Sequence, residues 1–574
     1  MTEEPSNRPR QVGYLIIGAG PAGLQLAYFL ERAGHDYLVL DAADRAGSYF
    51  DQFPRHDKLL SINKVHTGYT DREPQLRYDW NSLLCDDPEL AFTRYTSEYF
   101  PSARLLAKYF RDFAQRYALR VQYNTRVAAI DAGGPQASGA EPPETQRPNF
   151  LVTAADGARF ACRVLVAATG LAKPFVPNIP GIEHAENYWD CSIDPEDFKG
   201  QRVLILGKGN SAFETANHLT AVTRVTHLCS PNPIRMAWKT HFFGHLRAVN
   251  NDFLDTYILK GQNSVLDADI QRIEQVDGEF RVDLTFAHAK GQRAQLAYDR
   301  VIACTGFRWD PAYFGGGVSP ETTPCGRLPQ MTSAWESTNT PHLYYAGTIT
   351  QTRDLHKTMS SVLHGFRFNV KSLASILAER YESAPWPTQR LPLTAEALAD
   401  KVIERVSTSA ALMHQPGFLC DVLTVNAASV GEAAQPSAEY AETLAVDYAH
   451  DSRFGEQEHY YTVTMEYGDT LDDILAVRRE PDPDKAYNDF YLHPRIQRFR
   501  GNEKIAEHHM SESLENEWRL DRHPGERPLI RKIDFHGQDN AAEFQQTHRD
   551  RLIAFFAAQL AASGSQRALE DAPA

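Results

Sequence analysis

The chain has 574 residues, 42% of them hydrophobic and 23% charged, an ordinary composition for globular proteins and a length that implies several domains. The formal net charge of -15 argues against a nucleic-acid-binding protein, which would carry a basic surface. The N-terminal residues hold no apolar run and no stretch approaches the ~20 apolar residues of a membrane helix, so we expect a cytoplasmic protein without a membrane partner.

The first predicted element is a short buried strand, YLIIGAG, that ends in a glycine-rich turn and leads into a helical pattern. Gly18, Gly20 and Gly23 form G-x-G-x-x-G. In this motif the first glycine permits a tight turn, the second lets the backbone approach a pyrophosphate, and the third lets helix and strand pack closely. A second strand ends at Asp41, where a carboxylate meets ribose hydroxyls. The pattern predicts a dinucleotide site, and an acid here favours the free 2′-OH of FAD or NAD.

The same pattern recurs in QRVLILGKGNSAFETANHL. Gly207 and Gly209 match the first two glycines, and Ala212 occupies the third position, which is an allowed variant. The next strand ends without an acid and is followed instead by Arg235 and Lys239. Cations at this place accommodate a 2′-phosphate, so the second site is predicted to bind NADPH rather than NADH.

Three further strands that end in glycine indicate how the two nucleotide folds are joined. VLVAATG and RVIACTG end in Thr169-Gly170 and Thr305-Gly306 and are interpreted as return crossings between the two folds. HLYYAGT ends in Gly347-Thr348 and precedes a helical pattern, whose N-terminus is expected to point at a flavin ring. We therefore predict an α/β protein with two Rossmann-like domains, in which the NADPH domain is inserted in the FAD domain.

The predicted domain boundaries follow from these crossings. A proline-rich stretch marks a linker, and helical patterns with one alternating strand follow it. A Gly/Pro-rich stretch at 133–148 is predicted to be a hairpin insertion. The boundaries are 10–195 and 300–380 for the FAD-binding domain, 196–299 for the NADPH-binding domain, 381–393 for the linker, and 394–574 for an α/β C-terminal cap.

The cysteines and histidines bear on the type of chemistry. The seven cysteines are widely spread, with no C-x-x-C and no C-x4-C pair. A disulfide reductase of this architecture needs such a dithiol, so that function is disfavoured. His493, His508 and His509 lack an acid at ligand spacing, and we predict no metal site.

The motifs described so far, together with SINKVHTGYT, FYLHPRIQRF and AEHHMSESLENEW, resemble those of flavin-containing monooxygenases with two dinucleotide-binding domains. The chain is more similar still to the FAD-dependent oxidoreductase domain-containing family of the vertebrate endoplasmic reticulum. The resemblance implies FAD in the first site and NADPH in the second. It also implies a monooxygenase that forms a flavin C4a-hydroperoxide with O2 and oxygenates a soft nucleophile, for which the amino group of an amino acid or small amine is one candidate.

The same resemblance implies roles for individual residues. Asn63 matches an asparagine beside the flavin ring and is the predicted catalytic residue, a hydrogen-bond donor to the oxygenated flavin. Trp238 joins Arg235 in an Arg-x-x-Trp that clasps the NADPH phosphate. The remaining predicted cofactor contacts are Pro21, Ala22, Ala42, Ser48, Tyr49, Phe50, Val127, Asn210 and Ser211.

The substrate candidates lie in LRAVNNDFLDTYILK, after the NADPH phosphate loop. Arg247, Asn250 and Asn251 could bind a carboxylate and its neighbours, and the alternative is a loop held by amide hydrogen bonds. Two other functions stay open: an NADPH-oxidase-like flavoprotein that acts mainly through protein interactions, and the disfavoured disulfide reductase. The expected partners are a small-molecule substrate and O2, and the chain could form a homodimer.

Overall fold

The computed structural model describes residues 8–133, 149–257, 263–354, 357–426, 437–468, 480, 482–519 and 541–562. The chain separates into two compact units: a larger one of Met1–Asn63 and Leu83–Phe366, and a smaller one of Lys64–Ser82 and Arg367–Ala574. Nearly all of the predicted hairpin insertion lies outside the described residues. Within the described part of the chain, none of the helices has the length and apolar character needed to span a bilayer.

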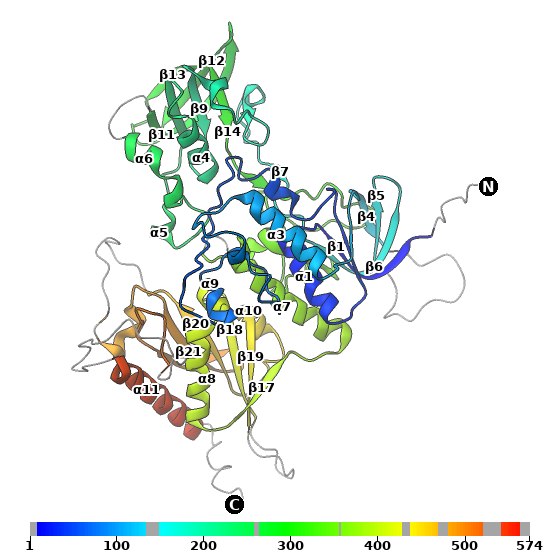
Figure 1. Cartoon of the computed structure of the whole chain (residues 1–574), viewed down its shortest axis with the longest axis vertical. Helices are drawn as coiled ribbons and strands as arrows, with labels where there is room; N and C mark the ends of the chain where they lie inside the picture. The colour runs from blue at the N-terminus through cyan, green and yellow to red at the C-terminus, as the bar shows by residue number, and fades with distance from the viewer. Residues whose placement is uncertain are drawn as a thin grey trace, which may run out of the picture. The chain divides into compact units, whose positions relative to one another are not determined.

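The first sheet of the larger unit is seven-stranded, in the order β3-β2-β1-β6-β5-β4 with β16 added on β6. Five strands run parallel, namely β3, β2, β1, β6 and β16, and register places Ile17 level with Leu40 and Ala167, and Ala167 level with Tyr345. Their carboxyl ends therefore meet at one edge, where an open α/β sheet binds its ligand. The elements are β1 (Arg10–Ile17), α1 (Pro21–Arg32), β2 (Tyr37–Leu40), α3 (Ala103–Arg116), β3 (Val121–Gln122), β4 (Val127–Ala132), β5 (Phe150–Ala154), β6 (Arg159–Ala167) and β16 (Leu343–Tyr345) (Figure 1).

The second sheet is also seven-stranded, in the order β13-β12-β11-β10-β9-β14-β8. Register places Leu206 level with Cys229 and Ala303, so three parallel strands again end at one edge. The elements are β8 (Glu186–Asn187), β9 (Arg202–Leu206), α4 (Asn210–Leu219), β10 (Val225–Ser230), α5 (Ala237–Thr240), α6 (Asp252–Tyr257), β11 (Asn263–Val276), β12 (Glu279–Phe286), β13 (Arg293–Tyr298) and β14 (Arg300–Ala303) (Figure 1).

The two return crossings pair with each other. β7 (Lys173–Pro174) and β15 (Phe307–Arg308) form a two-stranded antiparallel sheet between the two nucleotide folds. The second sheet is built from residues that lie, in sequence, between β6 and β16 of the first. The predicted fold class, with one Rossmann-like fold inserted in the other, is thereby confirmed.

The helix expected directly after Gly347 is different in the structure. A seven-residue 3-10 helix, η7 (Gly347–Arg353), follows β16, and the long helix α7 (Leu363–Glu382) starts later. Within η7 the Thr350 hydroxyl donates to the Gly347 carbonyl at 2.7 Å. Hydroxyls that bond to nearby backbone carbonyls compete with the α-helical ladder, which explains the tighter turn.

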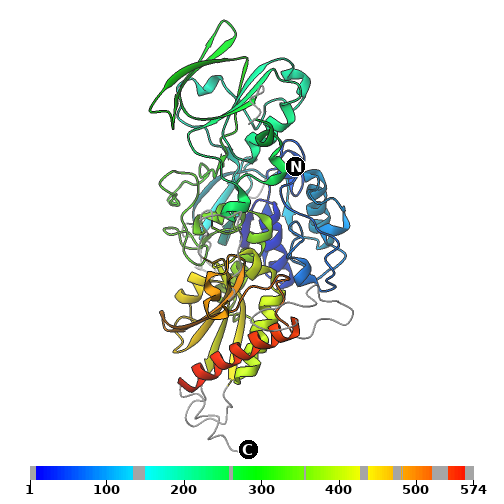
Figure 2. The ribbon, with the colours of Figure 1, turned by 90° about the vertical axis from the view of Figure 1, so that its left-hand side faces the viewer.

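The smaller unit is an antiparallel six-stranded sheet, with helices α8 (Ala395–Thr408) and α11 (Ala541–Ala562) on the same face (Figures 1 and 2). The strand order is β17-β19-β18-β20-β21-β22. Leu398 and Val402 of α8 and Leu552 and Phe556 of α11 share one buried core with strand residues such as Val463. The elements are β17 (Thr388–Pro392), α8 (Ala395–Thr408), α9 (Ala410–His414), β18 (Leu419–Asn426), β19 (Ser437–Ala445), α10 (Val446–Asp451), β20 (Tyr460–Glu466), β21 (His493–Arg500), β22 (Glu503–His509) and α11 (Ala541–Ala562).

The boundary of this unit differs from the sequence prediction. Residues 64–82 belong to it rather than to the FAD-binding domain, and it begins at Arg367 rather than at 394. The buried Arg77 guanidinium donates to the Val406 carbonyl at 2.7 Å and to the Asn516 carbonyl at 3.0 Å, which ties the segment to the unit. Most of the predicted linker, 381–393, is the end of α7 and the edge strand β17.

Candidate functional site: two glycine cradles

The first glycine turn has the geometry of a phosphate cradle. Gly18 has φ +107°, and a Cβ there would lie 2.6 Å from the Ala168 carbonyl oxygen. A Cβ on Gly23 would overlap the Gly18 carbonyl oxygen, so α1 packs directly on the turn. A Cβ on Gly20, by contrast, meets nothing within 4 Å. The middle glycine faces open space, which is what a pyrophosphate at the N-terminus of α1 requires.

Asp41 holds this turn through its carboxylate. Its oxygens accept hydrogen bonds from the backbone N–H of Ala19 at 2.5 Å and of Ala43 at 2.8 Å. Burial raises the pKa of Asp41, and the two N–H groups oppose that rise. A carboxylate oxygen accepts more than one hydrogen bond, so both retain capacity for ribose hydroxyls.

Other predicted flavin contacts converge on the same turn. The Gly47 N–H donates to the Ala19 carbonyl at 3.0 Å, which brings the 3-10 turn η1 (Ser48–Asp51), with Ser48, Tyr49 and Phe50, beside it. Gly347 has φ +82°, and a Cβ there would lie 2.7 Å from Cβ of Ala22. Thr169 and Gly170 continue the chain from β6 at the same edge, and Thr348 follows Gly347. Val127 begins β4 two residues after Thr125, whose N–H donates to the Asp41 carbonyl at 2.8 Å, and Ala42 is exposed.

The second turn repeats this geometry. Gly207 has φ +122°, and a Cβ there would overlap the Cys304 carbonyl oxygen. Gly209 again faces open space, with nothing within 4 Å of an added Cβ. Ala212 is fully buried at the third position. Thr305 and Gly306 leave β14 at the same edge, and the Thr305 hydroxyl donates to the Phe175 carbonyl at 2.5 Å.

The exposed cations of this second site lie after β10. Arg235, Trp238 and Lys239 are exposed, and Trp238 is 48% accessible. Sequence reasoning missed Lys208, the residue between the two glycines. Its ammonium donates to the Ser230 carbonyl at 2.7 Å and to the Asn232 carbonyl at 3.1 Å, and pairs with Asp267. Lys208 therefore shapes the loop on which the phosphate contacts are predicted. Its position between the two glycines of G-x-G could have identified it from the sequence.

Asn210 joins the second cradle to the predicted substrate segment. Its Nδ2 donates to the His245 carbonyl at 2.8 Å, and its Oδ1 accepts from the Arg247 N–H at 2.9 Å and from Asn250 Nδ2 at 3.3 Å. The side chains of Asn210 and Asn250 therefore hold the loop, as the alternative interpretation expected, and leave the start of α4, with Asn210 and Ser211, to face a ligand through its backbone.

Arg247 and Asn251 are placed differently from Asn250. The Arg247 guanidinium stacks on the Phe243 ring at 4.5 Å, and burial lowers its pKa. The Oδ1 atom of Asn251 is buried and accepts no hydrogen bond from any described residue. These two side chains remain the substrate candidates.

Asn63 is buried, with 1% exposure, but its amide is turned away from the predicted role. Nδ2 donates to the Thr96 carbonyl at 2.8 Å and to the Glu98 carbonyl at 3.3 Å. Both amide protons are thus used by the backbone of a neighbouring loop. Oδ1 is buried and has no partner among the described residues, so Asn63 offers an acceptor where a donor was predicted.

The cysteines do not form a reactive dithiol. All seven lie in the described residues and are free thiols. Cys191 and Cys304 interact electrostatically near the ends of β8 and β14, but burial raises the pKa of Cys191 to about 11 and that of Cys304 further. Buried thiols with raised pKa are poor nucleophiles. Nor do the described residues bring three or more metal-ligating side chains together, and His493 bonds to His509 at 3.1 Å.

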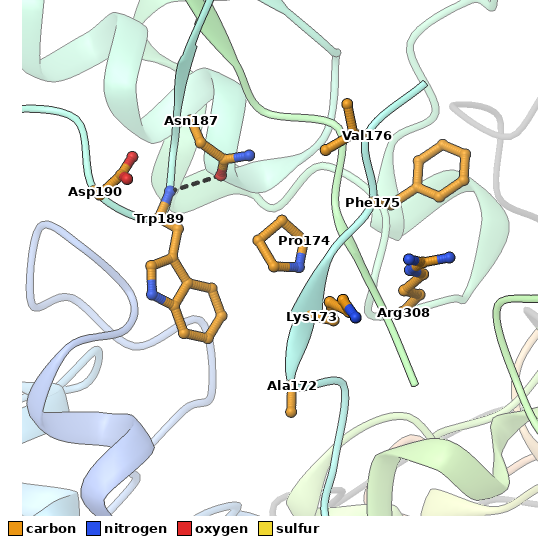
Figure 3. Close-up of a pocket in the computed structure, with 9 residues that line it drawn as sticks. All are labelled: Ala172, Lys173, Pro174, Phe175, Val176, Asn187, Trp189, Asp190 and Arg308. Atoms are coloured by element: carbon orange, nitrogen blue, oxygen red, sulfur yellow. Dashed lines mark hydrogen bonds between the residues drawn. The ribbon is translucent and has the colours of Figure 1, made fainter. Parts of the chain in front are cut away.

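A pocket of about 540 Å³ lies beside the return crossings rather than at the cradles (Figure 3). Lys173 and Arg308 face each other across β7 and β15, and Lys173 lies 3.5 Å from Asp310. None of the predicted cofactor or substrate residues lines it. The lining residues are Ala172, Lys173, Pro174, Phe175, Val176, Asn187, Trp189, Asp190 and Arg308.

Comparison with known proteins places this geometry among flavoproteins. A family model described as pyridine nucleotide-disulphide oxidoreductase matches residues 15–347. FAD-dependent oxidoreductase domain-containing protein 2 of Mus musculus is 36% identical over 524 residues, which cover 86% of this chain and 77% of the mouse protein. The probable indole-3-pyruvate monooxygenase YUCCA1 of Arabidopsis thaliana is 28% identical over 254 residues, 41% of this chain and 53% of the plant protein. A flavin-containing monooxygenase structure from Stenotrophomonas maltophilia matches 64% of this chain and 99% of its own, with 21% identity and a TM-score of 0.49.

Proposed function

The chain belongs to the pyridine nucleotide-disulphide oxidoreductase family of flavoproteins, and from that premise we propose that it is a monooxygenase acting on a small nucleophilic substrate. It is a flavin-dependent oxidoreductase whose cofactors are FAD and NADPH. The observation that carries the proposal is the pair of cradles in one unit, in each of which the middle glycine, Gly20 or Gly209, faces open space.

The residues fit the two cofactors in different ways. Gly20 and the N-terminus of α1 would hold the FAD pyrophosphate, and Asp41 its ribose. Gly209 and the start of α4 would hold the NADPH pyrophosphate. Arg235 and Lys239 are exposed and free of any ion pair with the described residues, so they support a 2′-phosphate.

When both cofactors are bound, NADPH supplies a hydride to FAD, and the reduced flavin supplies electrons to O2. The chain's task is to orient the two rings and to exclude water. Asn63, with its free acceptor oxygen, supports a site that binds an N–H group of cofactor or substrate.

The substrate class rests on Arg247 and Asn251. A guanidinium stacked on an aromatic ring pairs well with a carboxylate. The substrate named for the Arabidopsis relative, indole-3-pyruvate, also carries a carboxylate. We infer a small carboxylate-bearing substrate, with the amino group of an amino acid as the first candidate for oxygenation.

The test is the stoichiometry of NADPH, O2, peroxide and product. Purified protein is incubated with NADPH and, separately, with amino acids, amines and 2-oxo acids. A monooxygenase yields one oxygenated product per NADPH with at least one of these, and releases little peroxide. Return of all the consumed oxygen as hydrogen peroxide with every candidate would support the oxidase-like alternative. Absence of NADPH-dependent flavin reduction would overturn both.

A further inference from the structure

The chain that follows the turn η1 inserts into the second nucleotide fold. Phe53 is 2% exposed and belongs to the core formed by β8, β9 and α4. Its ring lies 5.9 Å from that of Tyr188 and 4.7 Å from that of Trp189. The flavin-side segment is thus anchored in the fold that is proposed to carry NADPH.

Hydrogen bonds continue this anchor to helix α4. The Arg55 N–H donates to the Tyr188 hydroxyl at 3.2 Å, and the Arg55 guanidinium donates to the Cys191 carbonyl at 2.5 Å. The Tyr188 hydroxyl in turn donates to the carboxylate of Glu214, which is 8% exposed. Glu214 lies one turn after Asn210, so the network reaches the helix whose N-terminus forms the second cradle.

The first helix carries a neutral residue at the equivalent place. Gln25 follows Gly20 by five residues, as Glu214 follows Gly209. Gln25 is fully buried, and its amide donates to the Leu84 carbonyl at 2.9 Å and accepts from the Leu84 N–H at 2.6 Å. A carboxylate is harder to bury than an amide. The buried carboxylate of Glu214, at the place where α1 carries a neutral amide, therefore indicates that the charge of Glu214 has a function.

The surroundings make Glu214 titratable near neutrality. Burial raises the pKa of Glu214 to about 7, against the opposing hydrogen bonds from Tyr188 and the Arg55 backbone. Partial burial and the Glu214 carboxylate raise the pKa of Tyr49 to about 12, and burial raises that of Cys304, so both face Glu214 as neutral groups. On α4 itself, His218 bonds to the Ile193 carbonyl at 2.9 Å, and its ring lies 4.2 Å from that of His56.

We propose that Glu214 is a positioning residue for hydride transfer, which through Tyr188 and Arg55 holds the NADPH helix against the flavin-side segment. The hold is tight when Glu214 is ionised, because a charged acceptor makes the stronger hydrogen bonds. Protonation loosens it. The inference rests on the proposed cofactors. It adds a residue through which pH controls the alignment of NADPH with FAD, and hence the rate of flavin reduction.

The first measurement is flavin reduction by NADPH, followed by anaerobic stopped-flow between about pH 5.5 and pH 9. The wild-type rate rises with pH, with a midpoint about 7. Glu214→Gln is expected to remove this dependence and to leave the rate about tenfold below wild type at pH 8, the difference between a neutral and a charge-assisted hydrogen bond. Tyr188→Phe, which keeps the ring, is expected to lower the rate at high pH.

A second measurement does not depend on turnover. The pKa of Glu214 is raised from 4.5 to about 7 in the folded chain, so its contribution to stability is present below about pH 4.5 and is lost as pH rises through 7. The melting temperature of Glu214→Gln is therefore expected to be higher than that of the wild type at pH 8 and equal to it at pH 5. A structural role alone would lower stability and rate together.

The control is His218→Gln, which removes another ionisable side chain of the same helix. This variant is expected to keep the wild-type midpoint. The inference is overturned if Glu214→Gln retains that midpoint, or if its melting temperature differs from wild type equally at both pH values. A wild-type flavin that NADPH does not reduce would instead overturn the proposed function, while the melting comparison would still report on Glu214.

Discussion

The two glycine cradles share a backbone and differ in what surrounds it. In the first, Gly23 lets α1 touch the turn, whereas the second accommodates the methyl group of Ala212. The first is closed by a carboxylate, Asp41, and the second by a buried ammonium, Lys208, beside exposed cations. The comparison teaches that the motif defines a place for a pyrophosphate, while the residues at the end of the following strand select the nucleotide.

The largest expected effect comes from exchanging the third motif residue. Gly23→Ala puts a Cβ onto the Gly18 carbonyl oxygen, so α1 must move and the variant is expected to lose bound FAD and melt earlier. The reciprocal Ala212→Gly should cost only ~1 kcal/mol of helix stability and keep FAD. Flavin-to-protein absorbance ratios and thermal melts check both. If Gly23→Ala keeps one FAD per chain, then close contact between Gly23 of α1 and the Gly18 carbonyl is not required for FAD binding.

A smaller and more selective effect is expected from the middle glycines. Gly20→Ala and Gly209→Ala add a methyl group where the protein leaves open space, so both should fold normally. Gly20→Ala is expected to lower FAD content, and Gly209→Ala to weaken NADPH binding by at least about tenfold, ~1.4 kcal/mol, with FAD retained. NADPH titration and flavin content separate the two. Loss of FAD in Gly209→Ala would contradict the assignment of cofactors to cradles.

The selection of the nucleotide should give the mildest change. Arg235→Ala and Lys239→Ala are each expected to raise KM for NADPH about tenfold, because each removes a charged contact to phosphate, and to leave KM for NADH unchanged. Glu183→Gln, a substitution of an exposed charge outside both cradles, serves as the control. Equal losses with both nucleotides would place the cations away from the 2′-phosphate.

The sequence was sufficient for features that local backbone chemistry determines. Gly18 and Gly207 have positive φ, and each follows a strand that ends level with the neighbouring parallel strands. The glycine motifs and the return crossings were therefore enough to predict two sheets, each with a cofactor site at one edge. Lys208 and Glu214 were missed, because their roles depend on partners such as Tyr188 that other parts of the chain supply.

The orientation of the Asn63 amide and the membership of residues 64–82 in the smaller unit could not be predicted from the sequence, for a related reason. The sequence singles out Asn63, but which of its two amide atoms is free depends on the carbonyls of Thr96 and Glu98. Residues 64–82 were predicted to belong to the FAD-binding domain, because no local sequence pattern indicates that Arg77 donates hydrogen bonds to the carbonyls of Val406 and Asn516.

That exchanged segment means that no single cut divides the polypeptide into two self-sufficient halves. A fragment that stops at residue 366 would retain residues 64–82 but lack the carbonyls that the Arg77 guanidinium needs, and a fragment that starts at 367 would lack the segment altogether. Splitting the two units for separate study thus requires replacing 64–82 by a short bridge between Asn63 and Leu83 in one gene and grafting the segment onto the other. Asn63 is also the last residue before the chain leaves the larger unit, so that bridge would begin at a residue whose Oδ1 atom is buried and accepts no hydrogen bond from the described residues.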